Sequence, residues 1–590
     1  MGVSPNQQSR PRPLGRVAKE DPMSSPTPGL PTTAAVPQSP FDPFDIFGSS
    51  LAVQQAWLRQ PERLAATVQD LALDAVRVHG RLVRAGCGIP SDPEVTAVRF
   101  DERFQQAAWT DQPWFAYLKE SYLLYSRWLE DAIYATEGVD PQQRRRAGFW
   151  TRQWLDAIAP TNFFWTNPEA LDRANSSQGV SVLQGWQHWL EDAAVKDIRM
   201  VKPDAFVVGR DLAATPGQVV LRNELLELIQ YAPSTPQVHA MPIVLVAPWI
   251  NKFYIMDLSP RNSLIRHLVG QGFTVFVTSW KNPGPEARAT TLDDYLLRGV
   301  RPALEAARAI AGVPQVHATG YCLGGTAVAM LLAWLNADVD DRAANPVAHW
   351  TTFTTLADFS DPGEIGVFLN QGSFDFLRRR MAKTGYLDGA DMARAFRMLR
   401  PNNLIWHYVI HSYLYGEELP PSDVLFWNCD STRMPAAMHE FYLRELYMNN
   451  RLIEPGRLEI GGRRLDLGAI SQPLYAVGAE QDHIAPWKQT FRLCGLTGGP
   501  ARYVLATSGH ILGIINPPVT PPKRRFWVGD ATGAQDAEAW REQVEKAPGS
   551  WWDDWTHWLG ERCGPLGPPP SLGNAAYPPL EPAPGRYVRE

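Results

Sequence analysis

The pentapeptide Gly320-Tyr321-Cys322-Leu323-Gly324 limits the possible folds of this chain more than any other segment. A strand-like run from Val313 to Thr319 leads into it, and the apolar stretch from Thr326 to Asn336 predicts a helix after it. Glycines let the chain turn sharply, and the start of a helix favours a thiolate on Cys322. The pattern predicts a nucleophile elbow, and its cysteine indicates acyl transfer through a thioester.

Length and charge restrict the classes of protein that fit. With 590 residues, 45% of them hydrophobic and 20% charged, the chain can bury a large core and is expected to hold two domains. A net charge of -6 argues against nucleic acid as the main partner. No apolar run approaches the roughly 20 residues of a transmembrane helix, and the first residues lack the apolar core of a secretory signal. We therefore expect a soluble, cytoplasmic protein.

The cysteines are widely spaced and include no C-x-x-C pair. Their odd number and spacing favour reduced thiols over disulfides, and no metal site is expected. They are Cys87, Cys322, Cys429, Cys494 and Cys563.

Three regions differ in composition. Residues 1–40 are rich in proline and polar residues, which predicts a disordered tail. Residues 41–203 show apolar positions at three- and four-residue spacing, which predicts a helical N-terminal domain. From residue 204 to 590, short β-rich runs alternate with helical ones, which predicts an α/β domain with a parallel sheet and crossover helices. The predicted strands are Ile243 to Ala247, Thr274 to Thr278, Val316 to Thr319, Trp350 to Leu356, Leu474 to Val477 and Tyr503 to Ala506.

A candidate acid and a candidate base follow the elbow in the order that this kind of site requires. Asp482 comes just after one predicted strand, and His510 comes just after the next. Since parallel strands end at the same edge of a sheet, both side chains can approach Cys322. The sequence therefore predicts a catalytic triad of Cys322, Asp482 and His510.

The separation between Cys322 and Asp482 is longer than a few βα units require. We place an insertion at about residues 358–452, which are dense in aromatic side chains. In this position it is interpreted as a cap or lid that excludes water from an acyl-cysteine. An elaborated helical layer without a gating role is the alternative.

Beyond the triad, an ordered set of motifs resembles the class I polyhydroxyalkanoate synthases. These matches extend from the helical region to the C-terminus and leave only the tail uncovered. They comprise the elbow with Gly325-Thr326, Thr166 to Glu169, Pro248 to Asp257, Phe426 to Asn428 with Asp430, Asp482 to Ile484 with Pro486-Trp487, Gly509 to Ile511, Asn516 to Pro518 and Pro582 to Val588.

The resemblance implies an α/β-hydrolase fold and the polymerisation of (R)-3-hydroxyacyl-CoA with release of CoA. Cys322 would carry the acyl group as a thioester, and His510 would act as general base. Asp482 would orient His510, or would activate the 3-hydroxyl of the substrate, and the sequence does not separate these roles.

Further site residues rest on loop position and on the resemblance. The backbone N–H groups of Leu323 and Ile250 are the candidates for an oxyanion hole. Arg400, within the insertion, is the candidate for a contact with CoA. The basic clusters 144–146 and 378–380 could also meet CoA phosphates, although such runs are more often solvated.

The resemblance also implies the partners. No cofactor is expected, because coenzyme A is part of the substrate and a product. The expected substrate is mainly short-chain, (R)-3-hydroxybutyryl-CoA. The growing polyester, the surface of its cytoplasmic granules and a second copy in a homodimer are the other expected partners.

Two alternatives stay open. A cysteine-dependent esterase or an intracellular polyhydroxyalkanoate depolymerase could use the same fold and release free hydroxy acid. A non-catalytic granule coat protein could share the overall pattern, but it would have no reason to keep Cys322, Asp482 and His510 in this order.

Overall fold

The computed structural model describes residues 41–89, 102–338 and 344–590. The predicted tail, residues 1–40, lies outside the described residues. A mixed 11-stranded sheet forms the core, in the order β15-β14-β13-β12-β7-β6-β4-β5-β2-β1-β17. Its central strands run parallel to one another. They are β5 (Val275–Trp280), β4 (Ile243–Val246), β6 (Val316–Tyr321), β7 (Val347–Phe353), β12 (Leu474–Ala479) and β13 (Ala501–Ala506).

These central strands coincide with the predicted ones. Most of their residues are buried, which is why they appear in the sequence as continuous apolar runs. The prediction placed β7 too late, because the strand ends at Phe353. Thr354 has a φ of 42°, a left-handed conformation that breaks the extended backbone.

The outer strands are antiparallel and were not predicted. The strand β2 pairs antiparallel with β5, β1 with β2, and β17 with β1, whereas β14 and β15 extend the opposite edge beyond β13. Their bounds are β1 (Gly217–Arg222), β2 (Leu226–Tyr231), β14 (Arg525–Asp530), β15 (Lys546–Pro548) and β17 (Glu581–Pro582). Short strands outside this sheet are β3 (Val238–His239), β16 (Leu566–Gly567), β8 (Tyr386–Leu387), β9 (Met434–Pro435), β10 (Glu459–Ile460) and β11 (Arg463–Arg464).

Helices between and after the strands cover the sheet. One of them, α19 (Trp551–Gly560), buries the side chains of Trp551, Trp552, Trp555 and Trp558. The indole of Trp555 donates a hydrogen bond to Thr351 of β7 at 3.0 Å, so α19 packs directly on that strand. The others are α8 (Leu264–Gly270), α9 (Leu292–Asp294), α10 (Arg301–Ala311), α11 (Leu323–Asn336), α17 (Trp487–Leu496) and α18 (Ala537–Gln543).

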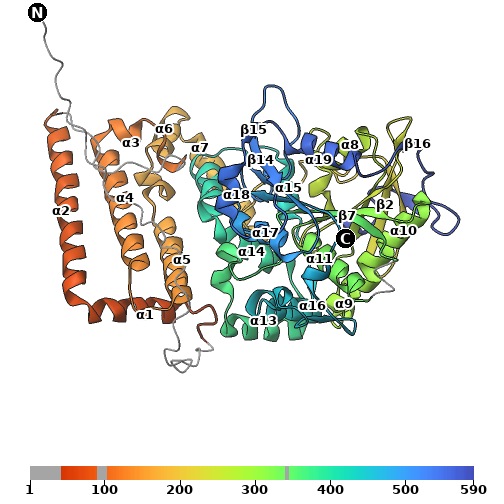
Figure 1. Cartoon of the computed structure of the whole chain (residues 1–590). Helices are drawn as coiled ribbons and strands as arrows, with labels where there is room; N and C mark the ends of the chain where they lie inside the picture. The colour runs from red at the N-terminus through yellow and green to blue at the C-terminus, as the bar shows by residue number, and fades with distance from the viewer. Residues whose placement is uncertain (1–40, 90–101, 339–343) are drawn as a thin grey trace, which may run out of the picture. The chain divides into compact units, whose positions relative to one another are not determined.

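The described part of the N-terminal helical region, residues 41–89 and 102–203, is helical as predicted (Figure 1, red to orange). Proline occupies the first turn of four of its helices, where its missing N–H costs no hydrogen bond. The side chains of Asp140 and Asn167 cap two of these helices. Its helices are α1 (Ile46–Arg59), α2 (Pro61–Gly86), α3 (Ala108–Asp111), α4 (Pro113–Tyr134), α5 (Pro141–Ala157), α6 (Pro168–Ser176) and α7 (Val180–Val195). The division into separate domains at residue 203 stays a prediction.

The insertion, residues 358–452, lies between β7 and β12 and is built almost entirely of short helices (Figure 1). Its α-helices are α13 (Gln371–Thr384), α14 (Gly389–Leu399), α15 (Asp423–Cys429) and α16 (Ala436–Tyr442). Its 3-10 and π segments are η7 (Gly363–Phe368), η8 (Asn402–Trp406), η9 (Val409–Leu414), η10 (Leu443–Met448) and η11 (Arg451–Ile453).

The N-terminal helical region packs against this insertion. Phe149 of α5 forms a buried cluster with Val367 and Leu399 of the insertion. Farther along, the Tyr413 hydroxyl donates to the carboxylate of Asp192 in α7 at 2.6 Å. The insertion therefore touches the helical region through both apolar and polar contacts.

Candidate active site

Cys322 occupies a sharp turn between β6 and α11. Its backbone angles, φ of 51° and ψ of -120°, lie outside the regions that non-glycine residues ordinarily adopt. This is the strained geometry of a nucleophile elbow. The turn needs glycine on both sides. A Cβ at Gly320 would overlap the backbone of Gly325, and one at Gly324 would overlap the carbonyl of Val246 at the end of β4.

Backbone hydrogen bonds hold the strained turn. The Cys322 N–H donates to the carbonyl of Phe353 in the neighbouring β7 at 2.8 Å. The Cys322 carbonyl accepts from the N–H of Gly325 at 2.9 Å and from the Thr355 hydroxyl at 3.2 Å. These contacts leave the half-buried thiol free to project from the turn.

Asp482 and His510 meet at the carboxyl ends of β12 and β13. The His510 Nδ1 lies 2.7 Å from Asp482 Oδ2. The other carboxylate oxygen, Oδ1, accepts from the N–H groups of Ile484 and Ala485 at 2.8 and 2.9 Å. The side chain of Asp482 is fully buried. Both of its oxygens are therefore engaged within the protein.

His510 is held between Asp482 and the elbow. Its ring stacks on Tyr321 with a centroid distance of 5.8 Å, and the Tyr321 hydroxyl donates to its backbone carbonyl at 3.3 Å. Burial by itself lowers the pKa of His510. The charge of Asp482 and the interactions with Asp482 and Cys322 outweigh the effect of burial and raise the pKa to about 10. The structure thus brings the thiol, imidazole and carboxylate together in sequence order.

Two tyrosines of the insertion, Tyr442 and Tyr447, lie near the thiol and were not singled out by sequence reasoning. Burial raises the pKa of both, and the charge of Cys322 adds to the rise, so both hydroxyls stay protonated. Their rings are 5.0 Å apart, and Tyr447 packs on Phe359 at 4.6 Å. The insertion therefore reaches the vicinity of the nucleophile with aromatic side chains.

The two amides predicted for an oxyanion hole lie on neighbouring elements. Leu323 begins α11, and Ile250 lies in the loop after β4, against which Gly324 packs. The insertion fixes that loop, because the Thr432 N–H donates to the Ile250 carbonyl at 3.2 Å. Within the described residues, neither the Leu323 N–H nor the Ile250 N–H donates a backbone hydrogen bond.

Arg400 is exposed at the C-terminal end of α14. Burial, followed by the charge of Arg400, lowers the pKa of His483, the residue that follows Asp482, to about 4. The Glu364 N–H also donates to the His483 carbonyl at 3.1 Å. Arg400 is thus on the insertion near the loop that carries the acid.

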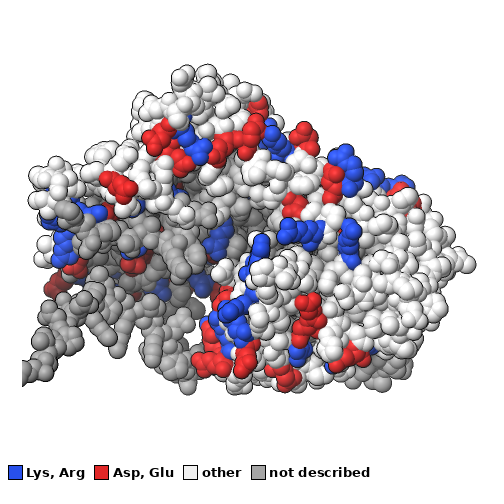
Figure 2. All heavy atoms as spheres, turned by 90° about the horizontal axis from the view of Figure 1, so that it is seen from above, with Lys and Arg blue, Asp and Glu red and all other residues white. Residues whose placement is uncertain are grey.

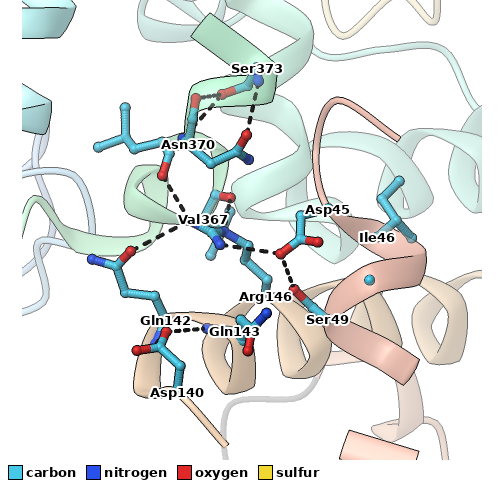
Figure 3. Close-up of polar contacts among 12 residues, drawn as sticks. Asp45, Ile46, Ser49, Asp140, Gln142, Gln143, Arg146, Val367, Asn370 and Ser373 are labelled. Atoms are coloured by element: carbon cyan, nitrogen blue, oxygen red, sulfur yellow. Dashed lines mark hydrogen bonds and ion pairs between the residues drawn. The ribbon is translucent and has the colours of Figure 1, made fainter. Parts of the chain in front are cut away.

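The two basic clusters do not form a common anion site. Lys and Arg side chains alternate with Asp and Glu on the face shown in Figure 2. In the second cluster, Arg378 pairs with Asp375 and Arg380 pairs with Asp391. In the first, Arg146 is buried and contacts Asp45 and the Leu369 carbonyl (Figure 3), which argues against a contact with CoA.

Two motifs far apart in the sequence, Pro248 to Asp257 and Phe426 to Asp430, meet beside the sheet. The Tyr254 hydroxyl donates to Asp430 at 2.8 Å, and the Trp427 indole donates to the Lys252 carbonyl at 2.7 Å. The buried carboxylate of Asp257 accepts from the hydroxyl groups of Thr215 and Ser263, both at 2.6 Å. These motifs fasten the insertion to the loop after β4, and only the folded chain reveals that role.

In the residues that the structure describes, no group of three or more His, Cys, Asp or Glu side chains is placed to hold a metal ion. None of the helices in the described ranges is long and apolar enough to cross a membrane.

Similarity to known proteins agrees with this geometry. Residues 100–268 match the family model described as poly-beta-hydroxybutyrate polymerase (PhaC) N-terminus, and residues 253–517 match the alpha/beta hydrolase fold. The chain is 41% identical over 541 residues to a poly(3-hydroxyalkanoate) polymerase of Methylorubrum extorquens, covering 91% of this chain and 88% of that protein. It is 41% identical over 502 residues to poly(3-hydroxyalkanoate) polymerase subunit PhaC of Cupriavidus necator, covering 84% of each.

A third relative, poly(3-hydroxyalkanoate) polymerase subunit PhaC of Rhizobium meliloti, is 37% identical over 541 residues, with 91% of this chain and 87% of that protein covered. The expected resemblance and the α/β-hydrolase fold are confirmed. With this identity over most of its length, the chain belongs to the poly(3-hydroxyalkanoate) polymerase family, a family of acyltransferase enzymes.

Proposed function

We propose that this protein polymerises (R)-3-hydroxyacyl-CoA into polyhydroxyalkanoate, with a covalent acyl-Cys322 intermediate and release of CoA. The observation that supports this most strongly is the strained elbow at Cys322 together with His510, whose Nδ1 lies 2.7 Å from Asp482 and whose pKa is raised by Asp482 and Cys322. The similarity of sequence to named polymerases over most of the chain agrees with it.

In the first half-reaction, the Cys322 sulfur attacks the thioester carbonyl of the substrate. The bond between that carbonyl and the CoA sulfur breaks, and CoA leaves with the proton that His510 holds. One thioester replaces another, so the acyl group stays activated for transfer. The N–H groups of Leu323 and Ile250 are proposed to stabilise the negative oxygen of the tetrahedral intermediate.

In the second half-reaction, the hydroxyl of a 3-hydroxyacyl group attacks the acyl-Cys322 carbonyl. The hydroxyl proton passes to His510, an ester bond forms, and the carbon–sulfur bond to Cys322 breaks. We assign to Asp482 the role of orienting His510 rather than of meeting the substrate. Its side chain is fully buried, and its two oxygens already accept from His510 and from two backbone N–H groups.

The insertion is proposed to keep water away from the acyl-enzyme. Tyr442 and Tyr447 bring aromatic surface close to Cys322, which supports such a role. Arg400 stays the candidate for a CoA contact, because it is exposed and lies near the acid loop. Coenzyme A enters as part of the substrate, and no separate cofactor is proposed.

We further propose a mainly short-chain substrate, (R)-3-hydroxybutyryl-CoA, a homodimeric enzyme and a cytoplasmic location on polymer granules. Exposed apolar side chains on the helical region support contact with an apolar surface. Trp165 is 79% exposed and Leu183 is 72% exposed, and both lie in this region.

The test uses purified full-length protein with (R)-3-hydroxyacyl-CoAs of graded chain length, following CoA release and insoluble polymer together. We expect both in the wild type and neither in Cys322→Ser, because a hydroxyl is a far weaker nucleophile at neutral pH. Cys429→Ser, at another cysteine of the chain, is the matched control and should behave as wild type. Release of free hydroxy acid without polymer would instead identify a hydrolase.

A further inference from the structure

The motif from Pro582 to Val588 has no role in the proposed reaction, yet it is firmly attached to the sheet. Its strand β17 pairs antiparallel with β1 at one edge. The side chain of Glu227 in β2 is fully buried and accepts from the backbone N–H groups of Arg586 and Tyr587, both at 3.1 Å. These contacts fix the position of the motif.

The same part of the chain reaches the loop after β4 through a buried lysine. Lys252 is 3% exposed, and its Nζ donates to the carbonyl of Tyr587 at 3.2 Å and to the main-chain oxygen of Glu590 at 2.7 Å. Burying an ammonium group costs much free energy unless the group is paired, so these oxygens compensate for its lost hydration. Burial lowers the pKa of Lys252, and the charges of Asp430 and Glu590 oppose that shift. Lys252 thus ties the loop after β4 to residues 587–590.

The insertion holds the main chain of this loop, whereas residues 587–590 hold its lysine side chain. The Thr432 hydroxyl donates to the Trp249 carbonyl at 2.7 Å, and the Trp427 indole donates to the Lys252 carbonyl at the same distance. Two segments that lie far apart in the sequence therefore fix the loop, and both act on Lys252.

This loop leaves the sheet beside the nucleophile. Strands β4 and β6 are parallel neighbours, and Val246, the last residue of β4, pairs with Gly320 of the elbow. A Cβ at Gly324 would overlap the Val246 carbonyl, so the end of β4 and the elbow are in backbone contact. Ile250, the proposed second donor to the oxyanion, comes four residues after Val246 and two before Lys252. A displacement of the loop therefore moves this donor relative to the acyl group.

We propose that Lys252 is a positioning residue for acyl transfer. Its ammonium group, held by residues 587–590, sets the loop after β4 so that the Ile250 N–H meets the negative oxygen of the tetrahedral intermediate. This inference rests on the proposed function. Donors in such a site act only when they lie about 2.7–3.1 Å from the oxyanion. Loss of the lysine anchor therefore slows acylation of Cys322 and leaves the thiol itself in place.

The test compares two reactions of Cys322 in the full-length protein. Acylation by (R)-3-hydroxybutyryl-CoA passes through an oxyanion, and rapid quench follows it as the CoA released in the first turnover. Alkylation by iodoacetamide displaces iodide at a saturated carbon and forms no oxyanion, and peptide mass spectrometry follows it at Cys322. Both rate constants are independent of the fraction of protein that is active.

In Lys252→Met, which keeps an apolar stem, we expect the acylation rate constant to fall about tenfold to a hundredfold. The alkylation rate constant should stay within about twofold of the wild-type value, because no oxyanion forms in that reaction. Lys488→Met is the matched control. The Lys488 side chain is 54% exposed and pairs with Glu538, and both rate constants should equal those of the wild type.

Deletion of residues 587–590 approaches the same contact from its other side and replaces Lys252→Met if that variant is insoluble. It removes both acceptors of Lys252 and should slow acylation by a similar factor. Adding Lys252→Met to the deletion should slow acylation less than about twofold further, because the two changes break the same contact.

Three results would overturn the inference. They are acylation of Lys252→Met at the wild-type rate, equal slowing of acylation and alkylation, and a full additional effect of Lys252→Met in the deletion variant. Failure of the wild type to release CoA would instead refute the proposed function, so the two failures are distinguishable.

Discussion

Arg146 provides a quantitative test of how the helical region holds the insertion. This arginine of α5 is buried, and its guanidinium contacts Asp45 at 3.3 Å, the Val367 carbonyl at 3.3 Å and the Leu369 carbonyl at 2.8 Å (Figure 3). It therefore joins the start of α1 to the segment that leads into α13. Replacing it by methionine keeps most of the apolar stem and removes every one of these contacts.

The cost follows from the burial of both charges. The side chains of Arg146 and Asp45 are only 7% and 12% exposed. Removing one partner of a buried ion pair costs about 3–5 kcal/mol, because the other charge stays buried without compensation. Within the described residues, the Asp45 carboxylate would keep only the hydroxyl of Ser49 as a partner, at 2.7 Å, and the carbonyls of Val367 and Leu369 would lose a donor.

The effect should appear as local opening, measured by hydrogen exchange with mass spectrometry. A free-energy change of about 1.4 kcal/mol changes an equilibrium constant tenfold. Arg146→Met should therefore speed hydrogen exchange roughly 10²-fold or more in peptides from α1 and from residues 363–384. Peptides from the central strands should be unchanged. Arg145→Met is the matched control, because that side chain is 58% exposed and its pair with Asp361 should contribute less than about 1 kcal/mol.

Two results would refute this reasoning. One is an acceleration of less than about tenfold in the α1 and insertion peptides of Arg146→Met. The other is an equal effect of Arg145→Met. Either result would mean that apolar packing alone holds the helical region against the insertion.

Three further predictions concern the site and the core. The pKa of His510 is raised from 6.5 to about 10, so its stabilising interactions are complete below pH 6.5 and are lost as the pH rises towards 10. The difference in unfolding free energy between wild type and His510→Gln should shrink over that interval, and a difference that grows would contradict the assignment. Gly324→Ala should prevent correct folding, seen as loss of soluble protein, because its Cβ would overlap the Val246 carbonyl. Gly86→Ala, which meets no atom within 4 Å, should stay soluble. The Cys494 thiol is buried, and burial raises its pKa, so iodoacetamide should modify it only after unfolding. Labelling of the native protein at this residue would show that the core opens.

The elbow, the parallel strands and the order of the triad could be predicted because their signals are local. A buried parallel strand needs a continuous apolar run, and the turn at Cys322 needs glycines within a few residues of it. Asp482 and His510 could be placed together because each follows such a strand. The predicted insertion is found as a set of short helices, although its role as a lid is still a prediction.

The outer strands and the buried arginine depend on partners that are far away in the sequence. The strand β17, close to the end of the sequence, pairs with β1, the first strand of the sheet in chain order. No pattern within Glu581–Pro582 predicts that pairing. Arg146 belongs to a run of arginines typical of a solvated surface, yet folding buries it against Asp45 and the insertion.

From the order of its residues alone, this chain could be recognised as an α/β protein with a cysteine nucleophile, an acid and a base. The charge states of its side chains and its buried polar contacts could not be predicted from the sequence. They depend on desolvation and on the distances between elements, which only the tertiary structure determines. The raised pKa of His510 and the buried ion pair of Arg146 with Asp45 are of this second kind.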